Sequence, residues 1–160
     1  MKLDDDQPTE GSERLELRSP AEPNEWGRYF DLRWRVLRKP WNQPRGSERD
    51  DRELDSSHLA LWDDRGRPVA GGRLQMNSPT DAQVRYMAVE REFAGQGLGS
   101  RILAGLEVRA RELGATRVVL NSRETARGFY DRHGYAAVGP AETMFGEVAH
   151  IRMSKTLSTR

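Results

Sequence analysis

The chain has 160 residues, of which 36% are hydrophobic and 32% charged, a balance that suits one folded domain with its own core. Its formal net charge of +1 gives no general reason to expect nucleic acid as a partner. The absence of cysteine excludes disulfides, thiolate metal sites and a cysteine nucleophile. No apolar run approaches the roughly 20 residues that span a bilayer, so we expect a cytoplasmic protein with no membrane partner.

The N-terminal part of the chain combines polar segments with one amphipathic helix. Residues 1–12 are acidic and offer almost nothing to bury, which predicts a disordered tail before a single domain over 13–157. The capping-box pattern of Ser19–Glu22 predicts the start of a helix, whose aromatic residues recur at helical spacing until Pro40 stops it. The charged segment 39–56 that follows predicts an irregular loop.

Strands and two further helices are expected in the rest of the chain. Leu98, Ile102 and Leu106 share one helical face, and Gly114 suits the C-terminal cap of that helix. The segment "RETARGFYDRHG" predicts a short helix closed by Gly134. Strand-like segments lie at 14–17, 58–62, 68–76, 83–89, 116–121, 135–138 and 146–154. This order of strands and helices predicts a mixed α/β protein.

A glycine-rich stretch, "FAGQGLGS", stands directly before the first of these two helices. Glycines let a backbone approach a ligand, and amides at a helix N-terminus attract anions, so the stretch suits a phosphate group. The alternative is a tight turn that needs glycine for geometry alone. A nucleotide-triphosphate loop is excluded because no Gly-Lys-Ser/Thr follows, and a dinucleotide fingerprint fits poorly because Ser100 and Asn121 replace its third glycine and its acidic residue.

Two segments, "VRYMAVEREFAGQGLGSRIL" and "VVLNSRETARGFYDRHGY", together resemble the GNAT family of N-acetyltransferases. The first matches the family's strand, Arg/Gln-x-x-Gly-x-Gly/Ala loop and helix, and the second its asparagine-ended strand and "FY-x-x-x-G-Y/F" helix. The resemblance covers about 57–155. It implies an α/β (α+β) fold with a mixed, mostly antiparallel sheet of six to seven strands, a central V-shaped splay and about four flanking helices.

The resemblance implies acetyl-coenzyme A as co-substrate and no metal. Ala94 departs from the family pattern, which has Arg or Gln there, and Gln96 or Arg101 are candidates to replace it. For Asn121 the alternative is a helix cap. The residues assigned to the coenzyme are Met87, Ala88, Val89, Ala94, Gly95, Gln96, Gly97, Leu98, Gly99, Ser100, Arg101, Asn121, Ala126 and Phe129.

The same resemblance assigns the chemistry to a few polar side chains. Tyr130 would protonate the departing coenzyme A thiolate, with a buried core tyrosine as the alternative. The acceptor amine must lose a proton, so a base or a water chain is needed. The candidate bases are Glu90, Glu92, His150 and His58, and a structural role on its strand is the alternative for His150. The segments "VLRKPW", "DDRELDSSHLAL" and "HIRM" loosely resemble the ElaA-like branch of the family.

The first helix and the 39–56 loop are expected to select the acceptor, a small-molecule or peptide amine. Trp34, Arg38, Trp41 and His58 are the proposed acceptor residues. Four acidic residues of the loop would attract a cationic amine, unless the loop is simply solvated and charged: Glu48, Asp50, Asp51 and Glu53.

Three functions are open on these grounds. The first is an N-acetyltransferase that moves an acetyl group directly from acetyl-coenzyme A to an amine, because without cysteine no acyl-cysteine forms. The second is a non-catalytic coenzyme A-binding module of the same fold, and the third an acyltransferase with a longer acyl donor. A monomer or a homodimer is expected.

Overall fold

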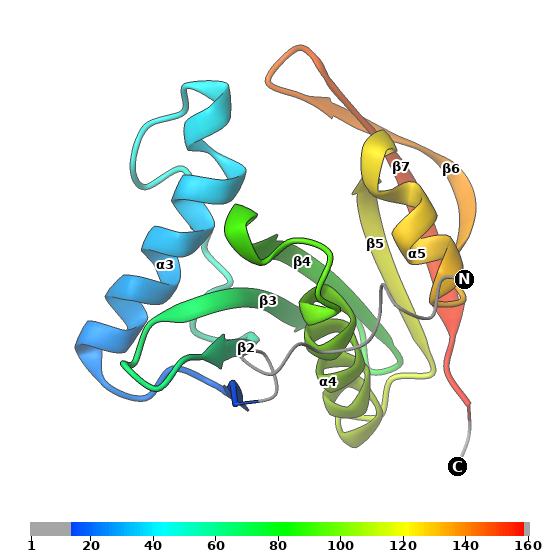
Figure 1. The fold of residues 1–160 in the computed structure, drawn as a ribbon. Coiled ribbons are helices and arrows are strands. Elements are labelled where there is room, and N and C mark those ends of the chain that lie inside the picture. The colour runs from blue at the N-terminus through cyan, green and yellow to red at the C-terminus, as the bar shows by residue number, and fades with distance from the viewer. Residues whose placement is uncertain (1–13, 159–160) are drawn as a thin grey trace. The chain divides into compact units, whose positions relative to one another are not determined.

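Over residues 14–158, the computed structural model shows a mixed α/β fold with one seven-stranded sheet and three α-helices (Figure 1). The strand order is β1-β2-β3-β4-β5-β7-β6. The pairs β1–β2, β5–β7 and β6–β7 are antiparallel and β4–β5 is parallel, which confirms the predicted class. About four helices were expected where the described part has three α-helices. The predicted tail over 1–12 lies outside the described residues.

The elements follow the predicted order closely. The helices are α3 (Pro23–Leu37), α4 (Leu98–Glu112) and α5 (Arg127–Arg132), with short 3-10 turns η1 (Lys39–Trp41), η2 (Arg91–Phe93) and η3 (Glu124–Ala126). The strands are β1 (Glu16–Arg18), β2 (Ser57–Trp62), β3 (Pro68–Met76), β4 (Asp81–Val89), β5 (Arg117–Arg123), β6 (Ala136–Met144) and β7 (Val148–Thr156). No helix in the described range is long and apolar enough to cross a membrane.

Helix α3 begins later than the capping-box pattern predicted. Its N-cap is Glu22, which forms the capping box with Glu25, so the Ser19–Glu22 box is wrong. Proline lacks an amide hydrogen and fits the first helical turn, which sets the start at Pro23. Arg18 lies 2.8 Å from the Glu25 carboxylate, and this bond, with two backbone amides, lowers the pKa of Glu25 to about 2.

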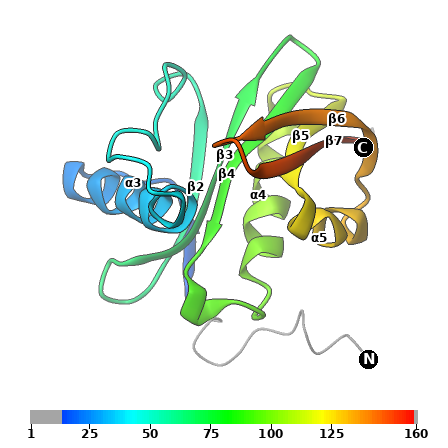
Figure 2. The same cartoon turned by 90° about the horizontal axis from the view of Figure 1, so that it is seen from above.

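The described residues form two compact units, one up to Arg73 plus Tyr86–Leu106, the other Leu74–Arg85 plus the residues after Leu106. The boundary falls inside β3, β4 and α4, so the units share these elements along the chain. In the first unit, consecutive glycines of β3 face different helices. A Cβ on Gly71 would lie 3.1 Å from the Tyr29 ring, whereas one on Gly72 would lie 2.9 Å from Ile102. Helices α3 and α4 therefore cover opposite faces of this strand (Figure 2).

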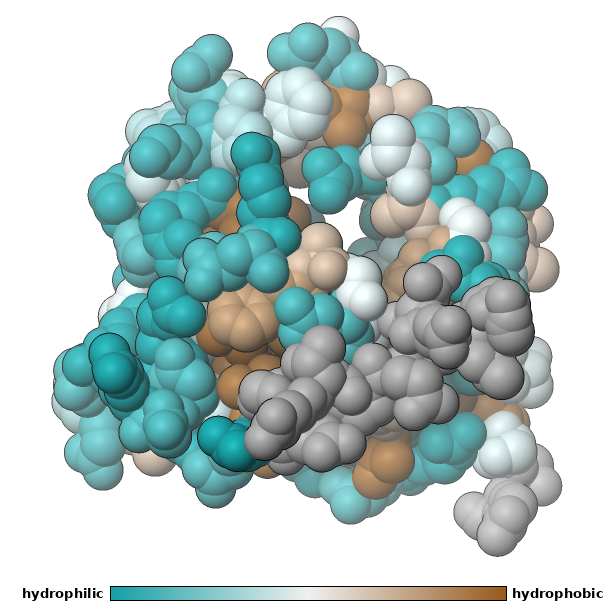
Figure 3. Space-filling model, in the orientation of Figure 1, coloured by the Kyte–Doolittle hydropathy of each residue, from teal (hydrophilic) through white to brown (hydrophobic). Residues whose placement is uncertain are grey.

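The core of the first unit is built from aromatic side chains of α3 and apolar residues of β2. Tyr29 and Phe30 pack with Ala60 and Trp62, and all four are buried. The opposite side of α3 is solvated, and the flank that it forms in Figure 3 is almost wholly hydrophilic. The apolar face thus fixes how α3 is oriented on its strands.

In the second unit, β5 is the buried centre. Val118, Val119 and Leu120 are at most 2% exposed, as expected for a strand covered on both faces. Helix α5 follows β5 directly through η3 (Figure 1). Its neighbour Tyr135 donates a 2.7 Å hydrogen bond to Glu107 of α4, whose other oxygen lies 2.9 Å from Lys155.

Candidate active site

The glycine-rich stretch forms an open loop between η2 and α4. Gly95 and Gly97 have φ values of 80° and 78°, in the left-handed region that side chains with a Cβ rarely adopt. A Cβ on Gly95 would meet nothing within 4 Å. The first-turn amides of α4 have no carbonyl of their own helix to bond, and the helix dipole makes this end positive. The loop can therefore offer backbone donors to an anion.

The same loop contains Ala94, which stands where the family pattern has Arg or Gln. Ala94 and Gly95 are exposed, so no apolar packing requires a small residue there. Arg101, one of the two candidate replacements for the family's polar residue, donates a 3.2 Å hydrogen bond to the Leu15 carbonyl. Its guanidinium is thus engaged with the segment that leads into β1.

Tyr130 has a buried ring and a hydroxyl with no hydrogen bond among the described residues. The ring is 7% exposed and packs edge-on against Phe129 and Tyr135, with ring centres 4.9 and 5.8 Å away. Burial raises the pKa of Tyr130 to about 12, partly opposed by the positive charge of Arg123. The hydroxyl is therefore neutral at physiological pH and able to donate.

Asn121 lies on the second unit with Tyr130, but not at the end of its strand. β5 continues to Arg123, and Asn121 pairs in register with Arg152 of β7. Arg123 is the N-cap of η3 and Ala126 that of α5, so the cap alternative for Asn121 is wrong. Its side chain is exposed. Contact with a coenzyme stays a prediction for Asn121, as it does for Ala126 and Phe129.

Two of the candidate bases, Glu90 and His150, have different surroundings. Both carboxylate oxygens of Glu90 accept from Arg35, at 3.1 and 2.7 Å, and its side chain is 12% exposed. A base role for Glu90 requires this ion pair to open. His150 is half-buried on β7, and its Nδ1 lies 2.9 Å from the Val148 carbonyl. A carbonyl only accepts, so Nδ1 carries the proton and Nε2 of the neutral ring is an acceptor.

His58 is held inside the first unit. Its Nε2 lies 2.8 Å from the Glu53 carbonyl and its Nδ1 2.9 Å from the Tyr29 hydroxyl, so both ring nitrogens are occupied. The residue is 5% exposed, and Trp26 packs edge-on against the ring. Any contribution of His58 to acceptor binding acts through the residues that it holds.

We expect His58 to make the protein less stable as the pH falls from 7 to 5. Burial lowers the pKa of His58, so below its ordinary value of about 6.5 the unfolded chain binds the proton more readily than the folded one. In His58→Gln the loss of unfolding free energy between pH 7 and 5 should shrink, by at most about 1.4 kcal/mol per pH unit. Urea unfolding at pH 7, 6 and 5 measures it. Identical pH slopes in both proteins would contradict the assignment.

The 39–56 loop is neither solvated throughout nor freely acidic. Trp34 donates from its indole nitrogen to the Gln43 carbonyl at 3.0 Å, and Arg38, 8% exposed, donates to the Ser47 carbonyl at 3.0 Å. Trp41 is half-buried in η1. These proposed acceptor residues therefore shape the loop from within. Four of the loop's acids are ion-paired with the protein's own arginines: Glu48, Asp50, Glu53 and Asp55.

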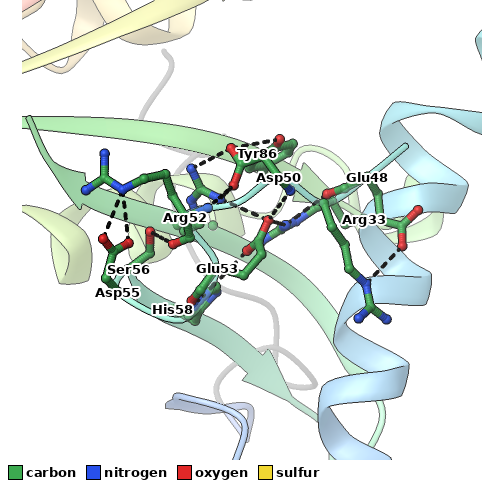
Figure 4. A network of polar contacts seen from close by, with 12 residues as sticks. Arg33, Glu48, Asp50, Arg52, Glu53, Asp55, Ser56, His58 and Tyr86 are labelled. Carbon is green, nitrogen blue, oxygen red and sulfur yellow. Dashed lines mark hydrogen bonds and ion pairs between the residues drawn. The ribbon is translucent and has the colours of Figure 1, made fainter. Parts of the chain in front are cut away.

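Two buried arginines and two of these acids form an ion-paired cluster that the sequence did not predict: Arg33, Arg73, Asp50 and Glu53. Arg33 of α3 and Arg73 of β3 are 2% and 0% exposed. Both contact the Glu53 carboxylate at 2.9 Å, and Arg73 also binds Asp50 with both terminal nitrogens. Figure 4 shows Arg33, Asp50 and Glu53 in this cluster. The sequence does contain a signal for these two buried arginines. Arg33 lies on the same helical face as Tyr29 and Phe30, and Arg73 interrupts an apolar strand.

Comparisons with known proteins agree with this fold. A model of the Acetyltransferase (GNAT) family matches residues 26–135. The chain is 30% identical over 126 residues to YjcF of Bacillus subtilis, described as an uncharacterized N-acetyltransferase, and the match covers 79% of this chain and 89% of YjcF.

Solved structures show the same architecture. Escherichia coli ElaA has a TM-score of 0.76 at 19% identity, with 88% of this chain and 99% of ElaA covered. An aminoglycoside 6'-N-acetyltransferase complexed with coenzyme A has a TM-score of 0.76 at 18% identity, with 91% and 98% covered. These two likenesses show the fold alone. Because the family model spans more than half of the chain and YjcF is matched over most of its length, the protein belongs to the GNAT family of acetyltransferases.

Proposed function

We propose that this protein transfers an acetyl group from acetyl-coenzyme A to an amine by direct attack. The observation that carries the proposal is the loop before α4, where Gly95 and Gly97 are left-handed and Gly95 is exposed, at the positive end of a 15-residue helix. Its amides are suited to the coenzyme's pyrophosphate, which is an anion. Family membership supports the reaction class.

In the proposed reaction, the amine nitrogen forms a bond to the thioester carbonyl carbon and the carbonyl π electrons move to oxygen. A backbone N–H from Met87–Val89 donates to that oxyanion. The oxyanion collapses, the carbon–sulfur bond breaks and the thiolate leaves. Tyr130 donates its hydroxyl proton toward the thiolate, and the proton lost by the amine passes to a base or to water.

We propose His150 as that base. Its Nδ1 donates to the Val148 carbonyl, which leaves the Nε2 lone pair to accept a proton. Glu90 remains the second candidate, with the Arg35 ion pair as the obstacle.

Acetyl-coenzyme A is expected to stabilise the protein against heat. At a hundred times Kd, linkage adds about 2.7 kcal/mol, which corresponds to about 5–10 °C in Tm for a chain of this size. NADH also carries a pyrophosphate and an adenine but lacks the pantetheine arm, so it should leave Tm nearly unchanged. Differential scanning fluorimetry measures both, and an absent shift with every coenzyme A ester would overturn the proposal.

Coenzyme release with a panel of amines and acyl donors separates the proposed reaction from its alternatives. Release with acetyl-coenzyme A and an amine supports the acetyltransferase. A thermal shift without release from any donor favours the non-catalytic binding module, for which exposed Ala94 is the supporting observation. Release only with longer donors favours the other acyltransferase.

A further inference from the structure

Tyr86 has an unusual backbone conformation for an aromatic residue in a strand. Its φ is 60°, and the other described non-glycine residues with positive φ, Asn42 and Phe145, lie outside helices and strands. Tyr86 is instead inside β4. A left-handed aromatic residue is strained and persists only where its surroundings hold it. The surroundings of Tyr86 therefore call for an explanation.

The strand pair around Tyr86 contains an extra residue. At the hairpin the Asn77 amide donates to the Asp81 carbonyl, and at the far end the Glu90 amide donates to the Val69 carbonyl. Between these two hydrogen bonds, nine positions of one strand (69–77) therefore lie opposite ten positions of the other (81–90). An extra residue with left-handed backbone indicates a β-bulge, a device that re-aims the backbone next to it.

Three buried arginines face the Tyr86 ring. The guanidinium carbon of Arg33 lies 4.1 Å from the ring centre, that of Arg73 4.9 Å and that of Arg38 5.5 Å. Asp50 joins this group, because it accepts hydrogen bonds from both terminal nitrogens of Arg73 at 2.6 and 3.0 Å. The Tyr86 hydroxyl is a further, longer contact of Asp50 at 3.4 Å. Cations over an aromatic face attract it, so the cluster holds the ring.

Met87, the next residue, is held from the other face of the sheet. A Cβ on Gly72 would lie 2.7 Å from the Met87 sulfur and 2.9 Å from Ile102, so the methionine fills the space that Gly72 leaves open towards α4. Gly72 and Arg73 are adjacent on β3 and contact Met87 and Tyr86 respectively. Two neighbouring side chains anchored on opposite faces leave the peptide between them little freedom.

We propose that Asp50 is a positioning residue that, through Arg73 and the Tyr86 ring, fixes the Tyr86–Met87 peptide so that its N–H meets the oxyanion of the acyl donor. The inference rests on the proposed acyl transfer. Asp50 belongs to the 39–56 loop, which is also expected to select the acceptor. The loop therefore sets the donor-side geometry as well, because its carboxylate holds the arginine that stacks on the bulge.

The test compares two carboxylates of the same loop. Asp50→Asn removes one of the two carboxylates that hold Arg73, the one that binds both of its terminal nitrogens, and leaves Glu53 in place. Asp55→Asn is the matched control, because Asp55 accepts two 3.0 Å contacts from Arg52 but has no contact with Tyr86 among those described. An oxyanion donor acts in the transition state, and losing one lowers kcat by about 10²–10³. A misaimed donor should lower kcat about tenfold or more in Asp50→Asn, with both KM values nearly unchanged. Asp55→Asn should keep wild-type kcat.

Two further measurements make the test specific. In the protein without substrate, the Met87 amide signal in NMR should shift in Asp50→Asn and stay in place in Asp55→Asn. Should Asp50→Asn fail to fold, Tyr86→Leu removes the ring and Tyr86→Phe keeps it, so only the leucine variant should lose kcat.

The measurements distinguish a failure of this inference from a failure of the proposed function. An active wild type with unchanged kcat in a folded Asp50→Asn protein would overturn this inference alone, as would a fall in kcat/KM that comes only from a raised acceptor KM. A wild type without any acyl transfer would overturn the proposed function itself.

Discussion

Replacing Gly97 by valine is expected to abolish the thermal shift that acetyl-coenzyme A produces. At φ 78° a β-branched residue is strained, so the loop must either bear that strain or move its amides. Hydrogen bonds to a charged group contribute about 1.5–3 kcal/mol each. Losing two of them weakens coenzyme binding by about 10²-fold or more. Isothermal titration with acetyl-coenzyme A measures the loss.

Gly146→Val is the matched control for strain. Gly146 has φ 73°, and a Cβ there would meet nothing within 4 Å. It lies in the turn between β6 and β7, which contains no residue assigned to the coenzyme. Both variants should lose about 1–2 kcal/mol of stability, whereas only Gly97→Val should lose the coenzyme. Equal coenzyme affinity in the two variants would mean that the glycines before α4 only shape a turn.

The parts of the fold that follow a local period were predictable from the sequence. The apolar face of α4 and the apolar centre of β5 were both placed correctly, because helical and buried-strand patterns specify burial directly. The start of α3 was misplaced because the capping-box rule names Ser or Thr as the N-cap, which fits Ser19, whereas the helix uses Glu22 as its N-cap. Only the packing of the helix chooses between Ser19 and Glu22, and the sequence does not display that packing.

The length of β6 was underestimated for a different reason. The strand was predicted to end at Val138, before Gly139 and Pro140, yet β6 continues to Met144. The strand lies at the edge of the sheet, paired only with β7 among the described strands. An edge strand tolerates a proline because one row of its amides needs no partner. Position in the sheet, which the local sequence does not reveal, decided the outcome.

The candidate site also has one part that the sequence predicted and one part that it did not. The glycine loop was predictable, because left-handed glycines before a helix form a local signature. The cluster around Tyr86 was not, because Arg73 and Asp50 are 23 positions apart and their pairing depends on how the loop returns. A buried arginine requires a carboxylate partner, and the sequence indicates that a partner is needed but not which residue supplies it. Long-range pairing of charges is thus the part that pattern analysis misses.

Tyr130→Phe is expected to lower kcat by roughly tenfold to a hundredfold, at or below the low end of general-acid assistance, which is typically about 10²–10⁴. The phenol, with its pKa raised to about 12, stays protonated, but full transfer to a thiolate whose conjugate acid has a pKa of about 8.5 is uphill. Its contribution is therefore mainly a hydrogen bond to the developing thiolate. The pH profile of kcat should show no alkaline limb from Tyr130 below about pH 10, because deprotonation begins only near the raised pKa.

Tyr135→Phe supplies the matched control, since the two buried tyrosines differ in what their hydroxyls contact. The Tyr135 hydroxyl donates to Glu107, which is 7% exposed, so its removal leaves a buried carboxylate short of a partner and should cost about 1–3 kcal/mol of stability while turnover survives. The Tyr130 hydroxyl has no such partner among the described residues, so Tyr130→Phe should cost less stability than Tyr135→Phe. Chemical unfolding and steady-state kinetics on both variants test the contrast. A folded Tyr130→Phe protein with full kcat would remove the tyrosine from the mechanism and leave water to protonate the thiolate.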